Sequence, residues 1–196
     1  MQTPQVSVPG HSFADYWGLG WMLMNWDDVM QYGHDGATAG NLSLFRVFPQ
    51  RGVAIALQCN AGDGGGFIRS VAGKLFRDLV NVDFPKPPAP TGRKFDLRPY
   101  EGTYERYFAR LEVEAGDGEL VCRGYGLKPS GELVSPEPVQ IIRLKPCSAE
   151  TFVEAVDGRQ PQSIEFLEFD ASGRPQFLFS GARALKRVNA GGRPSE

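Results

Sequence analysis

One of the chain's two histidines, His34, lies in a polar segment rich in glycine, "QYGHDGATAGN". If this segment forms a strand, period-two alternation places His34, Gly36 and Thr38 on one face. Gly36 has no Cβ, so a bound acyl group can lie against the strand, and the N–H of Ala37 is free to donate to a developing oxyanion. In this arrangement His34 is a polar or cationic partner beside the bound group. The alternative, which spacing alone favours, is a histidine exposed in a hairpin turn.

The runs around this segment predict an antiparallel sheet closed by one helix. Residues 16–24, 41–49 and 52–60 are rich in aromatic and branched side chains and are bounded by turn signals, with "PQRG" as a hairpin turn. Apolar residues recur at spacings of three and four over residues 67–80, which predicts an amphipathic helix. Three strands and one helix leave apolar surface uncovered, so we expect an N-terminal segment or another chain to complete the sheet.

A Pro-rich stretch, "FPKPPAPTGRKFD", divides the chain into unlike halves. About eight short alternating runs follow it, with hairpin turns at "AGDGE" and "DASGRP", and they predict a small antiparallel barrel or sandwich. We therefore expect an α+β fold with a sheet-and-helix domain over residues 1–84 and a linker over 85–94. A barrel over 95–189 and a disordered tail over 190–196 complete this expected organisation.

Composition narrows the classes of partner. The formal net charge of −2 gives no electrostatic reason to expect nucleic acid or an anionic membrane. Three widely spaced cysteines indicate neither a disulfide framework nor a zinc cluster, and no apolar run approaches the length of a membrane span. We expect no metal and no cofactor, because the candidate aspartates fall in predicted turns: Asp27, Asp28, Asp63, Asp117 and Asp170. We expect a cytoplasmic protein.

The order of the motifs "YWGLGWML", "YGHDGATAGN" and "NLSLFRVFPQRGVAIALQCNA" resembles the C-terminal end of the catalytic domain in penicillin-recognising serine hydrolases. Class C β-lactamases, D-aminopeptidases, DD-peptidases and related esterases belong to that family. In the family a Gly-Leu-Gly-Trp strand precedes a Lys-Thr-Gly or His-x-Gly triplet, whose place is taken here by His34, Asp35 and Gly36. "FDLRPYEGTYE" resembles the opening of the lipocalin-like barrel that extends some members.

The resemblance implies a β-lactamase-like (penicillin-binding-protein-like) fold followed by a lipocalin-like barrel. It implies catalytic roles for His34, Gly36 and Ala37, and substrate binding by Asp35 and Thr38. Asp35 departs from the usual Thr, Ser or Gly of the triplet, and its carboxylate would repel an anionic substrate group, which favours a neutral ester or amide.

Two motifs that the resemblance implies are absent from this chain. None of its serines has lysine three residues later, and none of its tyrosines has asparagine two residues later. We therefore expect the C-terminal part of a serine hydrolase that is inactive alone and is completed by an N-terminal hydrolase segment. Exposed sheet edges also predict self-association. The competing hypothesis is a non-catalytic binding protein whose barrel holds a small apolar ligand.

Overall fold

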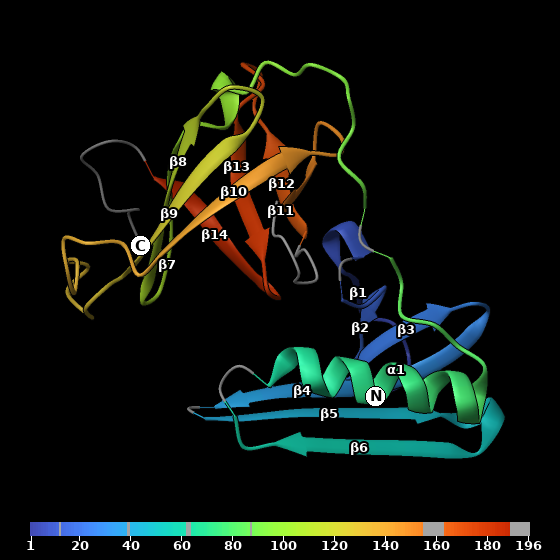
Figure 1. The fold of residues 1–196 in the computed structure, drawn as a ribbon. Helices are drawn as coiled ribbons and strands as arrows, with labels where there is room; N and C mark the ends of the chain where they lie inside the picture. Colours follow the sequence, from blue (N-terminus) through green and yellow to red (C-terminus); the bar gives the residue numbers. More distant parts are fainter. Residues whose placement is uncertain (12, 39, 62–63, 87, 155–162, 189–196) are drawn as a thin grey trace. The chain divides into compact units, whose positions relative to one another are not determined.

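The computed structural model of the protein describes residues 1–11, 13–38, 40–61, 64–86, 88–154 and 163–188. The chain divides into two compact units, Met1–Lys86 and Pro87–Glu196 (Figure 1). The division falls inside the Pro-rich stretch expected to be a linker. The expected tail, residues 190–196, lies outside the described residues.

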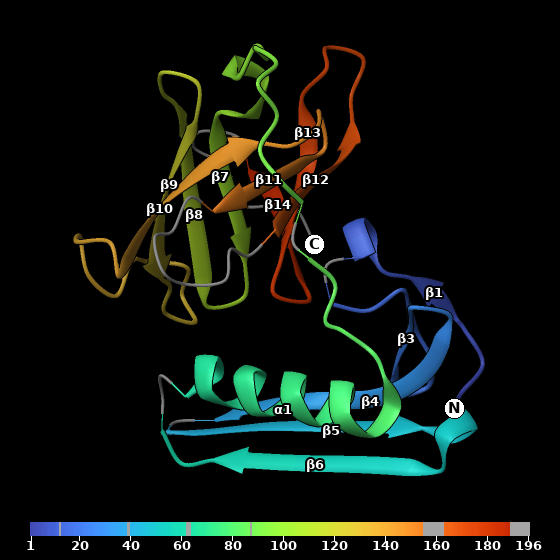
Figure 2. The ribbon, with the colours of Figure 1, turned by 45° about the vertical axis from the view of Figure 1, so that its right-hand side comes forward.

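The first unit is a six-stranded antiparallel sheet with a helix along one face (Figures 1 and 2). The order of strands in the sheet follows the chain, so each strand pairs with the next one. The strands are β1 (Val6–Ser7), β2 (Tyr16–Trp17), β3 (Met22–Trp26), β4 (Val29–Thr38), β5 (Asn41–Phe48) and β6 (Val53–Cys59). Helix α1 (Gly65–Val80) packs on β5 and β6. Among the described residues, no helix has both the length and the apolar character needed to cross a membrane.

Alternation along the strands explains why α1 lies on this face. Leu44 and Phe48 of β5 and Ile55 of β6 are buried, and they form one apolar cluster with the buried stripe of α1, namely Ile68, Ala72, Phe76 and Val80. Burying a side chain of this size contributes about 1.5–3 kcal/mol. Packing of the stripe, rather than helix propensity, therefore holds α1 in place, and Asn81 ends the helix in the left-handed conformation (φ 56°).

The prediction of a single strand over residues 16–24 is wrong, because a turn divides it into β2 and β3. The N–H of Gly18 donates to the Trp21 carbonyl at 2.8 Å, and Gly20 has φ 85°, which side chains with a Cβ rarely adopt. The next turn joins β3 to β4 through Asp27 and Asp28, which both have positive φ, as a two-residue hairpin turn of this twist requires.

Other local predictions are confirmed. The "PQRG" turn is the short 3₁₀ helix η2 (Pro49–Arg51) followed by Gly52 with φ 63°. "AGDGE" links β8 to β9, and "DASGRP" links β12 to β13, where the Asp170 carboxylate accepts hydrogen bonds from the N–H groups of Ser172 and Arg174.

The second unit is a closed eight-stranded antiparallel barrel. Of the two folds that the sequence predicted for this half, a small barrel or a sandwich, the barrel is therefore the correct one. Each strand pairs with the next, and the last pairs with the first: β7 (Gly102–Arg106), β8 (Ala109–Ala115), β9 (Leu120–Gly126), β10 (Gln140–Pro146), β11 (Thr151–Glu154), β12 (Ser163–Phe169), β13 (Pro175–Ser180) and β14 (Arg183–Val188). Inward side chains fill the core, including Tyr104, Phe152, Phe166 and Leu178, all completely buried. The space that a small apolar ligand would need is thus occupied at these positions by side chains of the protein.

Arg187 of β14 fastens the barrel to the 3₁₀ helix η3 (Arg98–Tyr100) that precedes it. Its guanidinium donates to the carbonyls of Pro99 and Pro175 at 3.0 and 3.2 Å and to the carbonyl of Glu101. It also donates to the hydroxyl of the buried Tyr104 at 3.2 Å. One side chain therefore ties η3, β13 and β14 together.

Candidate functional site

The candidate site lies where β4 loses one of its two neighbours. β3 pairs with β4 only as far as the pair Met22 and Gly33, whereas β5 pairs with β4 up to Thr38. Among the residues that the structure describes, no strand pairs with residues 34–38 on the side away from β5. The segment is therefore an interior strand up to Gly33 and an edge strand from His34 onward, and an edge strand can present backbone groups to a ligand.

The register of β4 with β5 sorts the candidate residues onto two faces. Asp35 is opposite Leu44, which is buried under α1, so Asp35 and Ala37 belong to the helix-covered face. His34 is opposite Phe45 and Gly36 is opposite Ser43, so His34, Gly36 and Thr38 share the other face. All five predicted residues are exposed and lie together in this segment.

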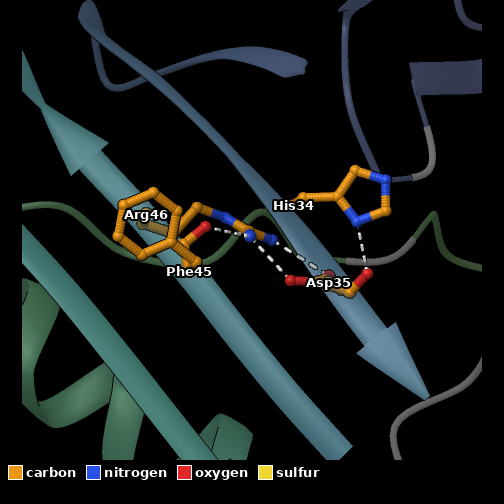
Figure 3. Close-up of polar contacts among 4 residues, drawn as sticks. All are labelled: His34, Asp35, Phe45 and Arg46. Atoms are coloured by element: carbon orange, nitrogen blue, oxygen red, sulfur yellow. Dashed lines mark hydrogen bonds and ion pairs between the residues drawn. The ribbon is translucent and has the colours of Figure 1, made fainter. Parts of the chain in front are cut away.

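The imidazole of His34 makes one hydrogen bond and one ring contact. Its Nδ1 lies 2.5 Å from the backbone carbonyl oxygen of Asp35 (Figure 3). The indole of Trp17 meets the imidazole edge-on with the ring centroids 5.6 Å apart. Because a carbonyl can only accept, Nδ1 is the donor and Nε2 is left for other partners.

The same hydrogen bond shows which way the backbone groups of β4 point. The carbonyl of Asp35 faces the unpaired edge, where the His34 ring reaches it. In an antiparallel strand the N–H and C=O of one residue point to the same side, and residues two apart share that side. The N–H of Ala37 therefore points to the unpaired edge as well.

Asp35 is held by an arginine that sequence reasoning missed. Arg46 of β5 donates to the two carboxylate oxygens at 2.6 and 3.0 Å and to the Phe45 carbonyl at 2.9 Å (Figure 3). The Arg46 side chain is 3% exposed and that of Asp35 is 45% exposed. The signal was present in "NLSLFRVF", because alternation places Arg46 between Leu44 and Phe48 on the buried face, where a cation requires a partner.

A second cation, Arg69 of α1, lies within electrostatic reach of the same carboxylate. Burial lowers the pKa of Arg69, and the charge of Asp35 acts against that shift. The Arg69 guanidinium also lies 4.0 Å from the centroid of the Phe84 ring. With Arg46 paired to it directly, the Asp35 charge is balanced locally, so the expected repulsion of an anionic substrate group is reduced.

A shallow depression of about 300 Å³ lies on the sheet face that carries Gly36, over the adjoining ends of β4, β5 and β6. Its lining includes Gly36, Ala37, Thr38, Asn41, Ser43 and Gln58. A Cβ on Gly36 would lie 2.5 Å from the hydroxyl oxygen of Ser43, so the missing side chain of Gly36 creates this space. Ser43 is a further polar group of the depression that the sequence did not indicate, because only the strand register brings it opposite Gly36.

Chemically, the segment offers an imidazole acceptor, a backbone donor and an open surface, but no activated nucleophile. Acyl transfer through a covalent intermediate needs a nucleophile beside a base. The chain contains neither Ser-x-x-Lys nor Tyr-x-Asn.

No protein-family model matches the chain. Penicillin-binding protein 4 of Amycolatopsis lactamdurans is 44% identical to it over 95 residues, which are 47% of this chain and 25% of that protein. Part of this chain is homologous to a penicillin-binding protein.

Two solved structures align with nearly the whole chain. The crystal structure of SurE with D-Leu superposes with a TM-score of 0.68 and 26% identity, over 94% of this chain and 42% of that one. A second crystal structure of SurE gives a TM-score of 0.65 at 26% identity, over 94% and 41%. This chain therefore spans a quarter to two fifths of the length of these relatives.

Proposed function

We propose that this chain supplies one wall of the acyl-transfer site of a penicillin-recognising serine hydrolase. The observation that carries the proposal is the unpaired end of β4, where His34, Gly36 and the N–H of Ala37 face open surface. The first unit would be the C-terminal part of a β-lactamase-like catalytic domain, and the second unit a lipocalin-like barrel. The homology to penicillin-binding protein 4 supports this assignment.

The proposed roles follow from where each residue lies. Nε2 of His34 orients the substrate or polarises the group that transfers the proton. Gly36 leaves room for the acyl group, and the N–H of Ala37 is one donor of the oxyanion hole. Thr38 lies on the same face and binds the substrate. Asp35 contributes through its backbone, because its carboxylate is engaged by Arg46.

We propose an ester or amide with an apolar residue of D configuration as the substrate class. SurE is described in complex with D-Leu, which supports a D-amino acid group. An aromatic surface lies on the His34 face, where the Trp21 ring is 5.8 Å from each of the rings of Tyr32 and Phe45. Such a surface suits an apolar side chain next to the scissile bond.

The proposed partner is a hydrolase segment that carries Ser-x-x-Lys and Tyr-x-Asn. Without a nucleophile and a base the chain alone forms no acyl-enzyme. The test is labelling with a fluorophosphonate or penicillin probe, applied to this chain and to the longer protein translated with the coding sequence upstream of Met1. We expect the probe to label the longer protein and not to label this chain. If the longer protein stays unlabelled and no upstream Ser-x-x-Lys is found, the hydrolase assignment is rejected.

A further inference from the structure

We propose that the ion pair between Asp35 and Arg46 is a positioning device for His34. It holds the Asp35 carbonyl against Nδ1 of the imidazole and thereby sets the tautomer in which Nε2 is the free acceptor. The inference rests on the proposed role of His34 and adds Arg46 as the residue that prepares the imidazole for it.

The carbonyl of Asp35 lies at the unpaired edge of β4. A backbone carbonyl in the middle of a sheet is occupied by the next strand, but the described residues place no strand against Asp35 on this side. Its carbonyl is therefore available to the neighbouring imidazole, at 2.5 Å from Nδ1. The Trp17 ring, 5.6 Å from the imidazole, restricts the ring from another direction.

The peptide group that carries this carbonyl needs an anchor other than a second strand. An edge strand with one neighbour has half the ladder hydrogen bonds of an interior strand, so its peptide planes are less constrained. Here the Asp35 side chain compensates, because two hydrogen bonds tie it to a guanidinium that is itself buried and bonded to the Phe45 carbonyl. Phe45 is the residue directly opposite His34, so the anchor lies across from the imidazole.

The residue types of the Asp35–Arg46 pair favour positioning as its role. A pair of apolar side chains would suit this face, where Leu44 and Phe48 are the neighbours of Arg46, and buried ion pairs add little net stability compared with apolar packing. What an arginine adds is a planar fork that fixes both carboxylate oxygens, and with them the orientation of the residue that carries them. Positioning explains the pair better than stability does.

The test is ¹⁵N NMR of the imidazole in the full chain, at a pH where histidine is neutral. His11 is the only other histidine, so the His11→Gln variant assigns the His34 signals. Free histidine in water favours the proton on Nε2. We expect His34 to favour the proton on Nδ1, and we expect Arg46→Met to shift the tautomer ratio toward that of free histidine by about fivefold, the equivalent of one hydrogen bond.

Arg46→Met keeps a buried apolar stem and leaves only the half-exposed Asp35 without its partner, so folding is expected to survive. Arg46→Lys retains the charge without the fork and should give an intermediate ratio. A wild-type His34 with its proton on Nε2, or a ratio that does not change in folded Arg46→Met, would overturn the proposal.

This experiment is independent of the proposed function. The tautomer is measured without substrate or nucleophile, so an unchanged ratio rejects the positioning role and leaves the acyl-transfer proposal standing. Conversely, if no probe labels the longer protein, the acyl-transfer proposal is rejected, whatever tautomer His34 adopts.

Discussion

Gly33 and Gly36, on either side of His34 and Asp35, lack a side chain for different reasons. A Cβ on Gly33 would lie 1.8 Å from the backbone oxygen of Phe45, so no rotamer change can relieve the contact. A Cβ on Gly36 would instead meet the Ser43 hydroxyl, which can rotate away. Gly33 is therefore required by the packing of β4 against β5, whereas Gly36 keeps the candidate site open.

The Gly33→Ala substitution should destabilise the first unit. Because β4 and β5 must separate to admit the methyl group, we expect the free energy of unfolding to fall by about 1–3 kcal/mol. All three tryptophans lie in residues 17–26, so urea unfolding followed by tryptophan fluorescence reports this unit. Gly66→Ala is the matched control, because a Cβ there meets nothing within 4 Å and should leave stability unchanged or raise it by up to about 1 kcal/mol. Equal stability of Gly33→Ala and wild type would contradict the strand register.

The three thiols should differ in reactivity. Cys122 is completely buried in the barrel, and burial raises the pKa of its thiol to about 12. In native protein we expect Ellman's reagent to modify Cys59 and Cys147, which are partly exposed, and to reach Cys122 only after unfolding.

The same pKa shift sets a pH dependence for the barrel. The folded state keeps the Cys122 thiol neutral, so this contribution to stability is complete below the unfolded pKa near 9 and is lost as the pH rises toward 12. We expect urea denaturation at several pH values to show that the free energy of unfolding falls with rising pH in wild type, and falls less in Cys122→Ala. Rapid modification of three thiols in native protein would contradict the burial of Cys122.

At the scale of the elements, β6 is an edge strand without the usual protection. Its sequence, "VAIALQC", contains no charge and no proline, and in the described residues it pairs only with β5. Natural edge strands usually carry a charged residue or a proline, which prevents pairing with other chains. The completed sheet that we propose would cover this edge.

Ala56→Lys should therefore reduce self-association of the chain. Ala56 is exposed on β6, and a lysine there places a charge beside the edge. We expect sedimentation velocity to show concentration-dependent association of wild type and a larger monomer fraction for Ala56→Lys. Ser70→Lys, on the exposed side of α1, adds the same charge away from the edge and should behave as wild type. A wild type that stays monomeric at all concentrations would argue against an open sheet edge.

Barrel closure depends on Arg187 more than on any neighbouring surface charge of β14. Arg187→Met removes donors from three carbonyls and from the Tyr104 hydroxyl, so we expect the barrel to lose about 2–4 kcal/mol. In urea unfolding followed by far-UV circular dichroism, the transition of the barrel should move to a lower urea concentration. The transition of the first unit, followed by tryptophan fluorescence, should keep its midpoint. Arg183→Met is the control on the same strand, because Arg183 is exposed and donates to the adjacent Ala182 carbonyl. Similar stabilities of the two variants would contradict the role assigned to Arg187.

For the whole molecule, local signals predicted elements better than they predicted the site. The barrel strands, α1 and the hairpin turns were predictable because alternation, helical spacing and Gly or Asp turns lie within a few residues of one another. The break between β2 and β3 was missed because Gly18 and Gly20 sit inside an apolar run. The Asp35–Arg46 pair and the position of Ser43 depend on strand register, which a single sequence does not encode locally.

In our proposal, the unpaired end of β4 forms part of an acyl-transfer site. The most direct test is the rate at which a penicillin or fluorophosphonate probe acylates the longer protein, compared between wild type and Gly36→Val. Because the valine side chain fills the space between Gly36 and Ser43 that we assign to the acyl group, we predict a loss of about 100-fold or more, with Ala54→Val on the exposed face of β6 unchanged. Equal acylation rates for Gly36→Val and wild type, or acylation of the 196-residue chain by itself, would contradict the account.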